Sequence, residues 1–295
     1  MTELTLNKQV LMSSAEHFST AQQINPYYDN TSPVDGMKAR EEHAGIAQLF
    51  REAGIVVETV AAPAGCQDGV YTANWGLVRG NTAVLARLPN ARKGEEAYAK
   101  AQLEARGLTV VTLPEDWHFS GQGDALPFGD MLFCGSGYRS DARAQAYVAE
   151  TFGFKRVQLR AIPERDALGQ PVINSVSGWA DSFFYDIDLA LSIIRPPDSN
   201  GLGGCIAYCP DAFEPESREK LAALEGIDKI EVNFEEATKG FACNLVSTGE
   251  TVVMSAHAPK FRAELEKRGL TVLTPEVTEL IKGGGFIRCV SLTLE

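Results

Sequence analysis

Histidine is scarce in this chain, which contains only four among 295 residues, at positions 17, 43, 118 and 257. None of the four has a spacing typical of a metal site. Cys205 and Cys209 are separated by three residues and have no matching second pair, so a zinc knuckle is not expected either. The sequence therefore predicts neither a metal nor a cofactor.

Signals for export and for membrane insertion are also missing. The first residues, Met1–Thr5, contain no basic region followed by an apolar stretch, and no run of about 18 apolar residues occurs anywhere. Without an export signal, we expect the six cysteines to be reduced thiols rather than a disulfide framework. We interpret the chain as a cytoplasmic protein.

Basic residues are few, since 27 lysines and arginines face 39 aspartates and glutamates, for a net charge of −12. An acidic surface argues against nucleic acid and against anionic membrane as partners, because both require basic patches. The same charge is compatible with a cationic ligand. With 44% hydrophobic residues, the chain can bury a large core in one domain or two.

What the sequence does contain is a repeated unit, in which an amphipathic helix ends at a glycine and an apolar strand follows at once. A glycine in this position fits a left-handed cap at the end of a helix. Five copies favour a repeat architecture around a shared core over an ordinary α/β fold. The predicted helices are 37–53, 95–106, 142–152, 216–225 and 259–268, the glycines are Gly54, Gly107, Gly153, Gly226 and Gly269, and the strands are 55–60, 108–113, 154–159, 227–232 and 270–273.

The third interval between these glycines is the longest and contains two loose stretches, Pro163–Gly178 and Arg195–Gly204. We expect them to flank a strand over Ser182–Ile194. Loops of this length within a compact domain are often functional.

Cys289 stands near the C-terminus, after three consecutive glycines and directly after Arg288. The glycines allow a sharp turn and a close approach to a ligand, because no Cβ is in the way. The following residues alternate as a short strand, and a neighbouring cation favours the nucleophilic thiolate. Cys289 is thus either a nucleophile presented by a glycine-rich loop or a buried, inert core cysteine.

Seven motifs occur together in an order that resembles the guanidino-group-modifying penteins, a superfamily of arginine dihydrolases, dimethylarginine dimethylaminohydrolases, arginine deiminases and amidinotransferases. The likeness extends over nearly the whole chain and is greatest to bacterial arginine dihydrolases and dimethylarginine hydrolases. The motifs are His17-Phe18 with Ile24-Asn25-Pro26, 68–78 (DGVYTANWGLV), 121–126 (GQGDAL), 137–140 (GYRS), 184–188 (FYDID), 241–244 (FACN) and the terminal Gly283-Gly284-Gly285 with Cys289.

This resemblance implies one pentein domain over residues 1–295, an α/β propeller of five blades with a central substrate channel. It also implies covalent catalysis, in which a cysteine thiolate attacks the guanidinium carbon and displaces an amine. Water or a second amine then resolves the amidino-thioether. Carboxylates hold the planar cation through charge-assisted hydrogen bonds.

The resemblance assigns Cys289 as the nucleophile and Asp188 as a carboxylate that binds the guanidinium. It implies that Asn74, Asp68 and Asn244 bind the substrate. Arg139 matches the group that holds a substrate carboxylate. The alternative for Arg139 is a surface cation, and for Asn74 and Asp68 it is turn formation, which both residue types favour.

Two positions depart from the superfamily pattern. Asp186 stands where the superfamily has a histidine that acts as acid and base, and Ser120 stands where it has a glutamate. In a strand, Asp186 and Asp188 would share one face, so that repulsion should raise one pKa and make an acid/base group of the pair. Alternatively the pair binds a cation, or Asp186 is a loss of function. His118 would lie on the same face of a strand as Ser120.

Three hypotheses about function follow. The first is a Cys289-dependent hydrolase or amidinotransferase on an arginine-like guanidino or amidino compound, with Asp186 and Ser120 as altered catalytic residues. The second is a catalytically degenerate pentein that binds a cationic amino acid or guanidino ligand without turnover. The third is a structural protein with a vestigial pocket. The expected partner is a small molecule, and the sequence is compatible with a homo-oligomer.

Overall fold

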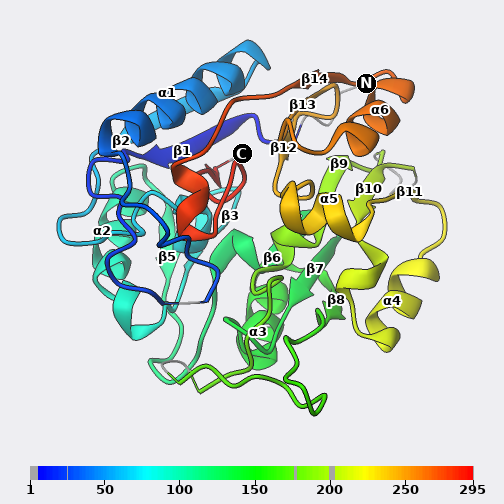
Figure 1. Cartoon of the computed structure of the whole chain (residues 1–295), viewed down its shortest axis with the longest axis horizontal. Helices are drawn as coiled ribbons and strands as arrows, with labels where there is room; N and C mark the ends of the chain where they lie inside the picture. The colour runs from blue at the N-terminus through cyan, green and yellow to red at the C-terminus, as the bar shows by residue number, and fades with distance from the viewer. Residues whose placement is uncertain (1–5, 25, 176–177, 199–202, 295) are drawn as a thin grey trace.

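The chain folds into five small sheets of three strands each, arranged in chain order about a centre (Figure 1). This is a computed structural model that describes residues 6–24, 26–175, 178–198 and 203–294. In every sheet the middle strand pairs antiparallel with one neighbour and parallel with the other. The sheets, in strand order, are β15 (Leu292–Thr293), β1 (Gln9–Ser13) and β2 (Val56–Val60); β3 (Gly76–Arg79), β4 (Thr82–Leu85) and β5 (Thr109–Val111); β6 (Ala125–Phe128), β7 (Met131–Gly135) and β8 (Lys155–Leu159); β9 (Leu191–Arg195), β10 (Cys205–Tyr208) and β11 (Asp228–Glu231); and β12 (Val246–Ser247), β13 (Thr251–Val253) and β14 (Thr271–Leu273).

A helix makes each parallel connection, because two parallel strands require a crossover that a tight turn cannot supply. The crossover helices are α1 (Gly36–Glu52), α2 (Gly94–Glu104), α3 (Ala142–Phe152), α4 (Pro215–Ala222) and α6 (Pro259–Lys267), while the short α5 (Phe234–Lys239) lies outside this pattern. The five predicted glycines follow these helices with φ between 70° and 85°. The repeat, the five-bladed α/β fold and four of the left-handed caps are therefore confirmed, whereas Gly226 lies four residues beyond the end of α4 and does not cap this helix.

The two ends of the chain meet in the first sheet. Strand β15 pairs antiparallel with β1, so that Val10 lies opposite Thr293 and Leu11 opposite Leu292. The segment just before β15 contains Cys289, and its last turns run through the middle of the molecule (Figure 1). Closure of the ring thus fixes the position of this cysteine.

Two strand predictions are wrong. The strand expected over Ser182–Ile194 exists only from Leu191, because a 3-10 turn over Ile187–Leu189 precedes it. The buried carboxylate of Asp124 accepts a hydrogen bond of 2.9 Å from the backbone N–H of Ile187, which diverts this segment from a ladder. Cys289 likewise lies in a turn, and the strand begins three residues later.

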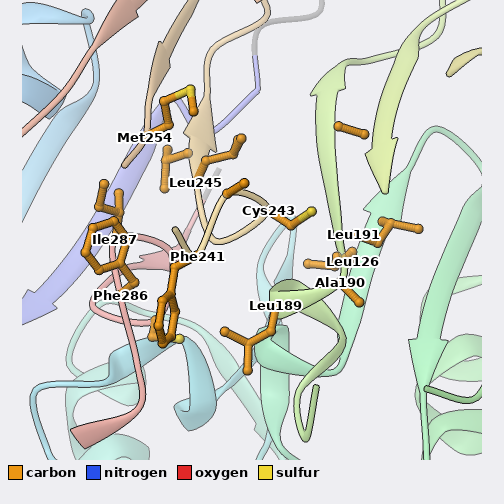
Figure 2. Packing of buried hydrophobic residues seen from close by; sticks show 14 of the residues in the cluster. Leu126, Leu189, Ala190, Leu191, Phe241, Cys243, Leu245, Met254, Phe286 and Ile287 are labelled. Atoms are coloured by element: carbon orange, nitrogen blue, oxygen red, sulfur yellow. The ribbon is translucent and has the colours of Figure 1, made fainter. Parts of the chain in front are cut away.

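The largest hydrophobic cluster joins side chains from different blades. Figure 2 shows Leu126, Leu189 and Leu191 near Cys243, with Phe241 and Phe286 beside them. Such packing explains how short strands are stable, because each sheet covers apolar surface of its neighbours. Within the described residues, no helix has the length and apolar character needed to cross a membrane.

Candidate active site

Cys289 is buried at the centre of the ring, where the side chain of Asn244 forms hydrogen bonds with it. The side-chain amide of Asn244 donates a hydrogen bond of 3.2 Å to Sγ, and its oxygen accepts from the backbone N–H groups of Arg288 and Cys289 at 3.0 and 3.3 Å. Oδ2 of Asp188 lies 3.6 Å from the same sulfur. Asn244 and Asp188, two of the residues that the sequence predicts to bind the substrate, therefore contact the cysteine.

The electrostatic surroundings keep Cys289 protonated in the free protein. Burial, followed by the negative charges of Asp188 and Asp186, raises the pKa of the Cys289 thiol well above its ordinary value. We expected Arg288 to favour the thiolate; its charge does attract the Cys289 thiolate, but burial and the two aspartates outweigh this attraction in the free protein. Its guanidinium extends to neutral oxygens of Gln122 and Thr293, at 2.8 and 2.9 Å.

Three buried carboxyl groups, those of Asp124, Asp186 and Asp188, interact with one another, and the last two act on Cys289. Burial and the charge of Asp186 raise the pKa of Asp188 and that of Asp124 well above the ordinary range for aspartate. One oxygen of Asp186 and one of Asp188, Oδ1 in each case, is buried without a hydrogen-bond partner among the described residues. An acceptor of this kind calls for a donor, which a planar cation would supply.

Asn74 connects the two positions that depart from the superfamily pattern. Its amide nitrogen donates to Oγ of Ser120 at 2.9 Å and to Oδ2 of Asp186 at 2.9 Å. The Ser120 backbone N–H donates in turn to Oγ of Ser140 at 3.0 Å. Ser120 is therefore a buried hydroxyl next to Asp186, without the negative charge that a glutamate would bring.

Arg139 lies at the entrance rather than on the open surface. Its side chain is 13% exposed. The guanidinium stacks on Tyr185, 3.9 Å from the ring centre, and forms an ion pair of 3.6 Å with Oδ2 of Asp186. Asp68 is fully inside, where its carboxylate accepts a hydrogen bond of 2.6 Å from the hydroxyl of Tyr28 and burial raises its pKa. Both residues border the space beside Cys289.

Sequence reasoning missed a second arginine, Arg92, which is also buried beside this space. It forms a bidentate ion pair with Glu95, with both contacts at 2.7 Å, and donates to Oδ1 of Asn74 at 2.7 Å. In the sequence, Arg92 and Glu95 are three residues apart, which is the spacing of an ordinary surface ion pair on a helix, so no local signal indicated that this pair is buried.

Tyr71 was also missed, although the three glycines were a signal for it. A Cβ added at Gly285 would lie 2.5 Å from the Tyr71 ring and 3.0 Å from Cβ of Cys289. The Tyr71 hydroxyl donates to the carbonyl of Leu280 at 2.6 Å. The close approach expected of the glycines is real, but the partner is an aromatic ring of the protein.

The space beside Cys289 is narrow and continues into a wider chamber. The inner void has a volume of about 10 Å³, which is room for roughly one water, and the outer chamber about 140 Å³. Arg139 and Tyr185 border both. The predicted loop Pro163–Gly178 contributes Asn174 to the wall of the outer chamber. The half-exposed ring of His118 also lines this chamber and packs edge-on against Trp179, with ring centres 5.0 Å apart. A substrate must therefore displace side chains to reach the thiol.

The chemical types in this space suit a ligand with a cationic and an anionic end. The carboxyl group of Asp186 borders this space with the thiol, which Asp188 contacts, and Arg139 borders both this space and the outer chamber. No cluster of three or more metal-ligating side chains occurs in the described residues.

Comparison with known proteins agrees with this geometry. Residues 11–174 match the sequence profile of the family described as N,N dimethylarginine dimethylhydrolase, eukaryotic. The bifunctional arginine dihydrolase/ornithine cyclodeaminase ArgZ of Synechocystis sp. is 31% identical over 96% of this chain, which spans 37% of that relative's length. The N(G),N(G)-dimethylarginine dimethylaminohydrolase of Mycobacterium tuberculosis is 32% identical over 97% of this chain and 86% of its own. Among solved structures, an ArgZ N-terminal domain variant covalently bound to a reaction intermediate superimposes with a TM-score of 0.82 at 29% identity, covering 97% of both chains.

Proposed function

This chain belongs to the dimethylarginine dimethylhydrolase family of guanidino-modifying penteins, and we propose that it is a Cys289-dependent hydrolase of a guanidino or amidino group in an arginine-like compound. The observation that carries the proposal is the contact of 3.6 Å between the Cys289 sulfur and Asp188, beside two unsatisfied carboxyl oxygens. Transfer of the amidino group to a second amine is the variant of the same chemistry.

Binding follows from charge and shape. A planar guanidinium donates hydrogen bonds to the free oxygens of Asp186 and Asp188, which places its central carbon next to Sγ. Asn74 and Asp68 form the wall, Asn244 orients the thiol, and Arg139 takes the substrate's carboxylate at the rim of the chamber. The cation also lowers the pKa of Cys289, because it offsets the carboxylates that raise it.

The reaction then takes two steps. The thiol proton passes to the carboxyl pair of Asp186 and Asp188, and the sulfur attacks the guanidinium carbon to form a C–S bond. The C–N bond to the departing amine breaks, and the pair returns the proton to that nitrogen. Water next adds to the amidino carbon and gives a proton to the pair, the C–S bond breaks, and a urea-type product leaves as the thiol re-forms. In transfer, an amine replaces this water.

Asp186 takes the acid/base role in this scheme, since it stands where the superfamily has its histidine. It is buried, Asn74 holds its Oδ2, and Oδ1 remains available for a substrate proton. Ser120 supplies a neutral hydroxyl that positions Asn74. Because an aspartate replaces the histidine of the superfamily pattern, the site fits a substrate whose leaving amine needs less assistance.

A second candidate function is binding without turnover. The narrow void beside Cys289 and the raised pKa of the thiol are the observations that favour it. The relatives named above as hydrolases favour catalysis instead. The two candidates differ in one outcome, because only the enzyme forms a covalent adduct and a product.

The test is incubation of the whole chain with arginine, methylated arginines, agmatine, citrulline and guanidino acids, read by intact-protein mass and by release of amine. We expect an amidino adduct on Cys289 with at least one compound, and its loss together with turnover in Cys289→Ala. Cys66→Ala is the matched control, because Cys66 is a free thiol outside this contact network. Asp186→Asn should slow turnover by about 10²–10⁴-fold, the usual contribution of a general acid/base. Turnover that survives in Cys289→Ala would exclude this function, and stabilisation by a guanidino ligand without any adduct would establish the binding protein.

Two coarser expectations complete the proposal. Residues 1–295 form a single pentein domain, and the ligand is a small molecule. A homo-oligomer remains compatible with this arrangement, and sedimentation of the purified chain measures it.

A further inference from the structure

A second and larger cavity lies next to the catalytic centre. Its volume is about 310 Å³, comparable with roughly ten waters at liquid density, and it shares no lining residue with the void beside Cys289 or with the outer chamber. Asp188 separates it from the active site, since this residue lines the cavity while Oδ2 contacts the Cys289 sulfur. The proposed reaction makes no use of this cavity.

The walls of the cavity are mainly apolar. Side chains come from several blades and from the chain ends, and Figure 2 shows Leu126, Leu191, Cys243 and Leu245 of this set converging. Enclosed apolar walls with a few polar groups are typical of sites for small organic molecules.

The polar end of the cavity contains a buried cation without a hydrogen-bonded counter-ion. Arg288 is 7% exposed, and its guanidinium donates only to neutral oxygens, those of Gln122, Thr293 and Asn7. Among the described residues, no carboxylate lies within 4.0 Å of it. Burial lowers the pKa of Arg288, and the charges of Asp188 and Cys289 offset this effect only in part. Asp188 also lines the cavity but forms no ion pair with Arg288.

A second polar group in the cavity lacks a partner. Ser192 is 5% exposed and lines the cavity, and its Oγ atom has no hydrogen-bond partner among the described residues. Leaving a buried hydroxyl without a partner is unfavourable, so its persistence points to a ligand acceptor or a water. At the rim, Arg79 adds a second cation, stacked 4.0 Å from the ring centre of Phe154.

We propose that this cavity binds a small carboxylic acid with a short apolar chain, whose carboxylate pairs with Arg288. The carboxylate supplies the counter-charge that Arg288 lacks, and it accepts a hydrogen bond from Ser192. The chain packs against the apolar walls, and Arg79 attracts the anion into a protein whose net charge of −12 would otherwise repel it. The site is distinct from the guanidino site, which selects a cation.

The test is calorimetric titration of the whole chain with hexanoate, hexylammonium and hexan-1-ol, which share one apolar chain and differ in charge. We expect hexanoate to bind at one site at least tenfold more tightly than the other two. Arg288→Met and Ser192→Ala should weaken hexanoate binding, by at least tenfold and severalfold respectively. Arg139→Gln is the matched control, because it removes a cation from the guanidino site and should leave hexanoate binding unchanged.

A further pair of variants keeps the test decisive if Arg288→Met does not fold. Arg79→Ala removes the exposed rim cation and should weaken hexanoate binding severalfold, whereas Arg156→Ala removes an exposed arginine from strand β8 and should not. Three results would overturn the proposal. They are equal binding of hexylammonium, loss of binding in Arg139→Gln alone, and the absence of saturation at about 20 mM, which means an affinity weaker than about −2.3 kcal/mol. None of these readouts depends on turnover, so the proposal stands or falls separately from the enzymatic function.

Discussion

The sulfur of Cys289 lies 3.6 Å from Oδ2 of Asp188, and the charge of Asp188 raises the pKa of the thiol, whereas the hydrogen bond from the thiol lowers the pKa of Asp188. Both groups are fully buried, so water screens this repulsion little. The thiol therefore stays protonated at rest and becomes reactive when a cation enters beside it. This arrangement makes the substrate's own charge part of the activation.

The first prediction concerns this pair directly. Asp188→Asn removes a negative charge next to the thiol, so the pKa of Cys289 should fall and the thiolate fraction at pH 7.5 should rise. Alkylation by iodoacetamide, followed by peptide mass at Cys289, should accelerate about tenfold for each unit of lowered pKa. In the unchanged protein the rate should keep rising with pH beyond 9, because the thiol ionises late.

Asp211→Asn is the control for this experiment, since that carboxylate is 63% exposed and paired with Arg218. It should leave the alkylation rate of Cys289 unchanged. If Asp188→Asn slowed alkylation, the repulsion inferred here would not exist.

The second prediction concerns the buried pair of Arg92 and Glu95. Arg92→Met leaves an unpaired carboxylate inside and should lower the free energy of unfolding by about 3–5 kcal/mol. Adding Glu95→Gln should recover part of that loss, because the uncompensated charge disappears. Lys100→Met, which breaks an exposed pair with Glu104, should change stability by about 1 kcal/mol or less. Denaturant titration measures all four proteins, and a loss in the double variant as large as that in Arg92→Met, or larger, would contradict the coupling.

The third prediction is a pH dependence of stability that arises from His43. Burial lowers the pKa of this histidine to about 4, from an ordinary 6.5. The unfolded chain therefore binds the proton first, so stability is complete above pH 6.5 and declines as the pH falls toward 4. The loss amounts to about 3 kcal/mol at most.

His43→Met should remove this part of the acid sensitivity, so the difference in Tm between pH 7 and pH 4.5 should shrink. His17→Met, at an exposed position, should not alter that difference. An unchanged difference in His43→Met would show that other groups control acid unfolding.

The fourth prediction tests how closely the backbone approaches the site. A Cβ at Gly123 would lie 2.6 Å from the amide nitrogen of Asn74 and 2.7 Å from Oδ2 of Asp186. Gly123→Ala should therefore displace both side chains, reduce turnover by at least tenfold and destabilise the protein by about 1–3 kcal/mol. Gly45→Ala is the control, because no atom lies within 4 Å of its added Cβ and alanine favours helix α1 by up to about 1 kcal/mol. Normal kinetics in Gly123→Ala would contradict the proposed geometry.

The sequence by itself determined the blades, because each blade depends on local signals. Helical periodicity, a glycine after each helix and a short apolar strand are all contained within about 25 residues, and Gly153 and Gly269 show the predicted cap. Motif order also identified the superfamily and the central cysteine. These features required no knowledge of long-range contacts.

Only the tertiary structure decided the electrostatics of the site. Arg288 is adjacent to Cys289 in sequence, yet its side chain extends away to Gln122 while Asp188, 101 residues distant, contacts the sulfur. The 3-10 turn before β9 likewise depends on the remote carboxylate of Asp124. Charge interactions depend on distance and burial in space, so neighbours in sequence predict them poorly, whereas helix caps and strand periodicity are properties of the local chain.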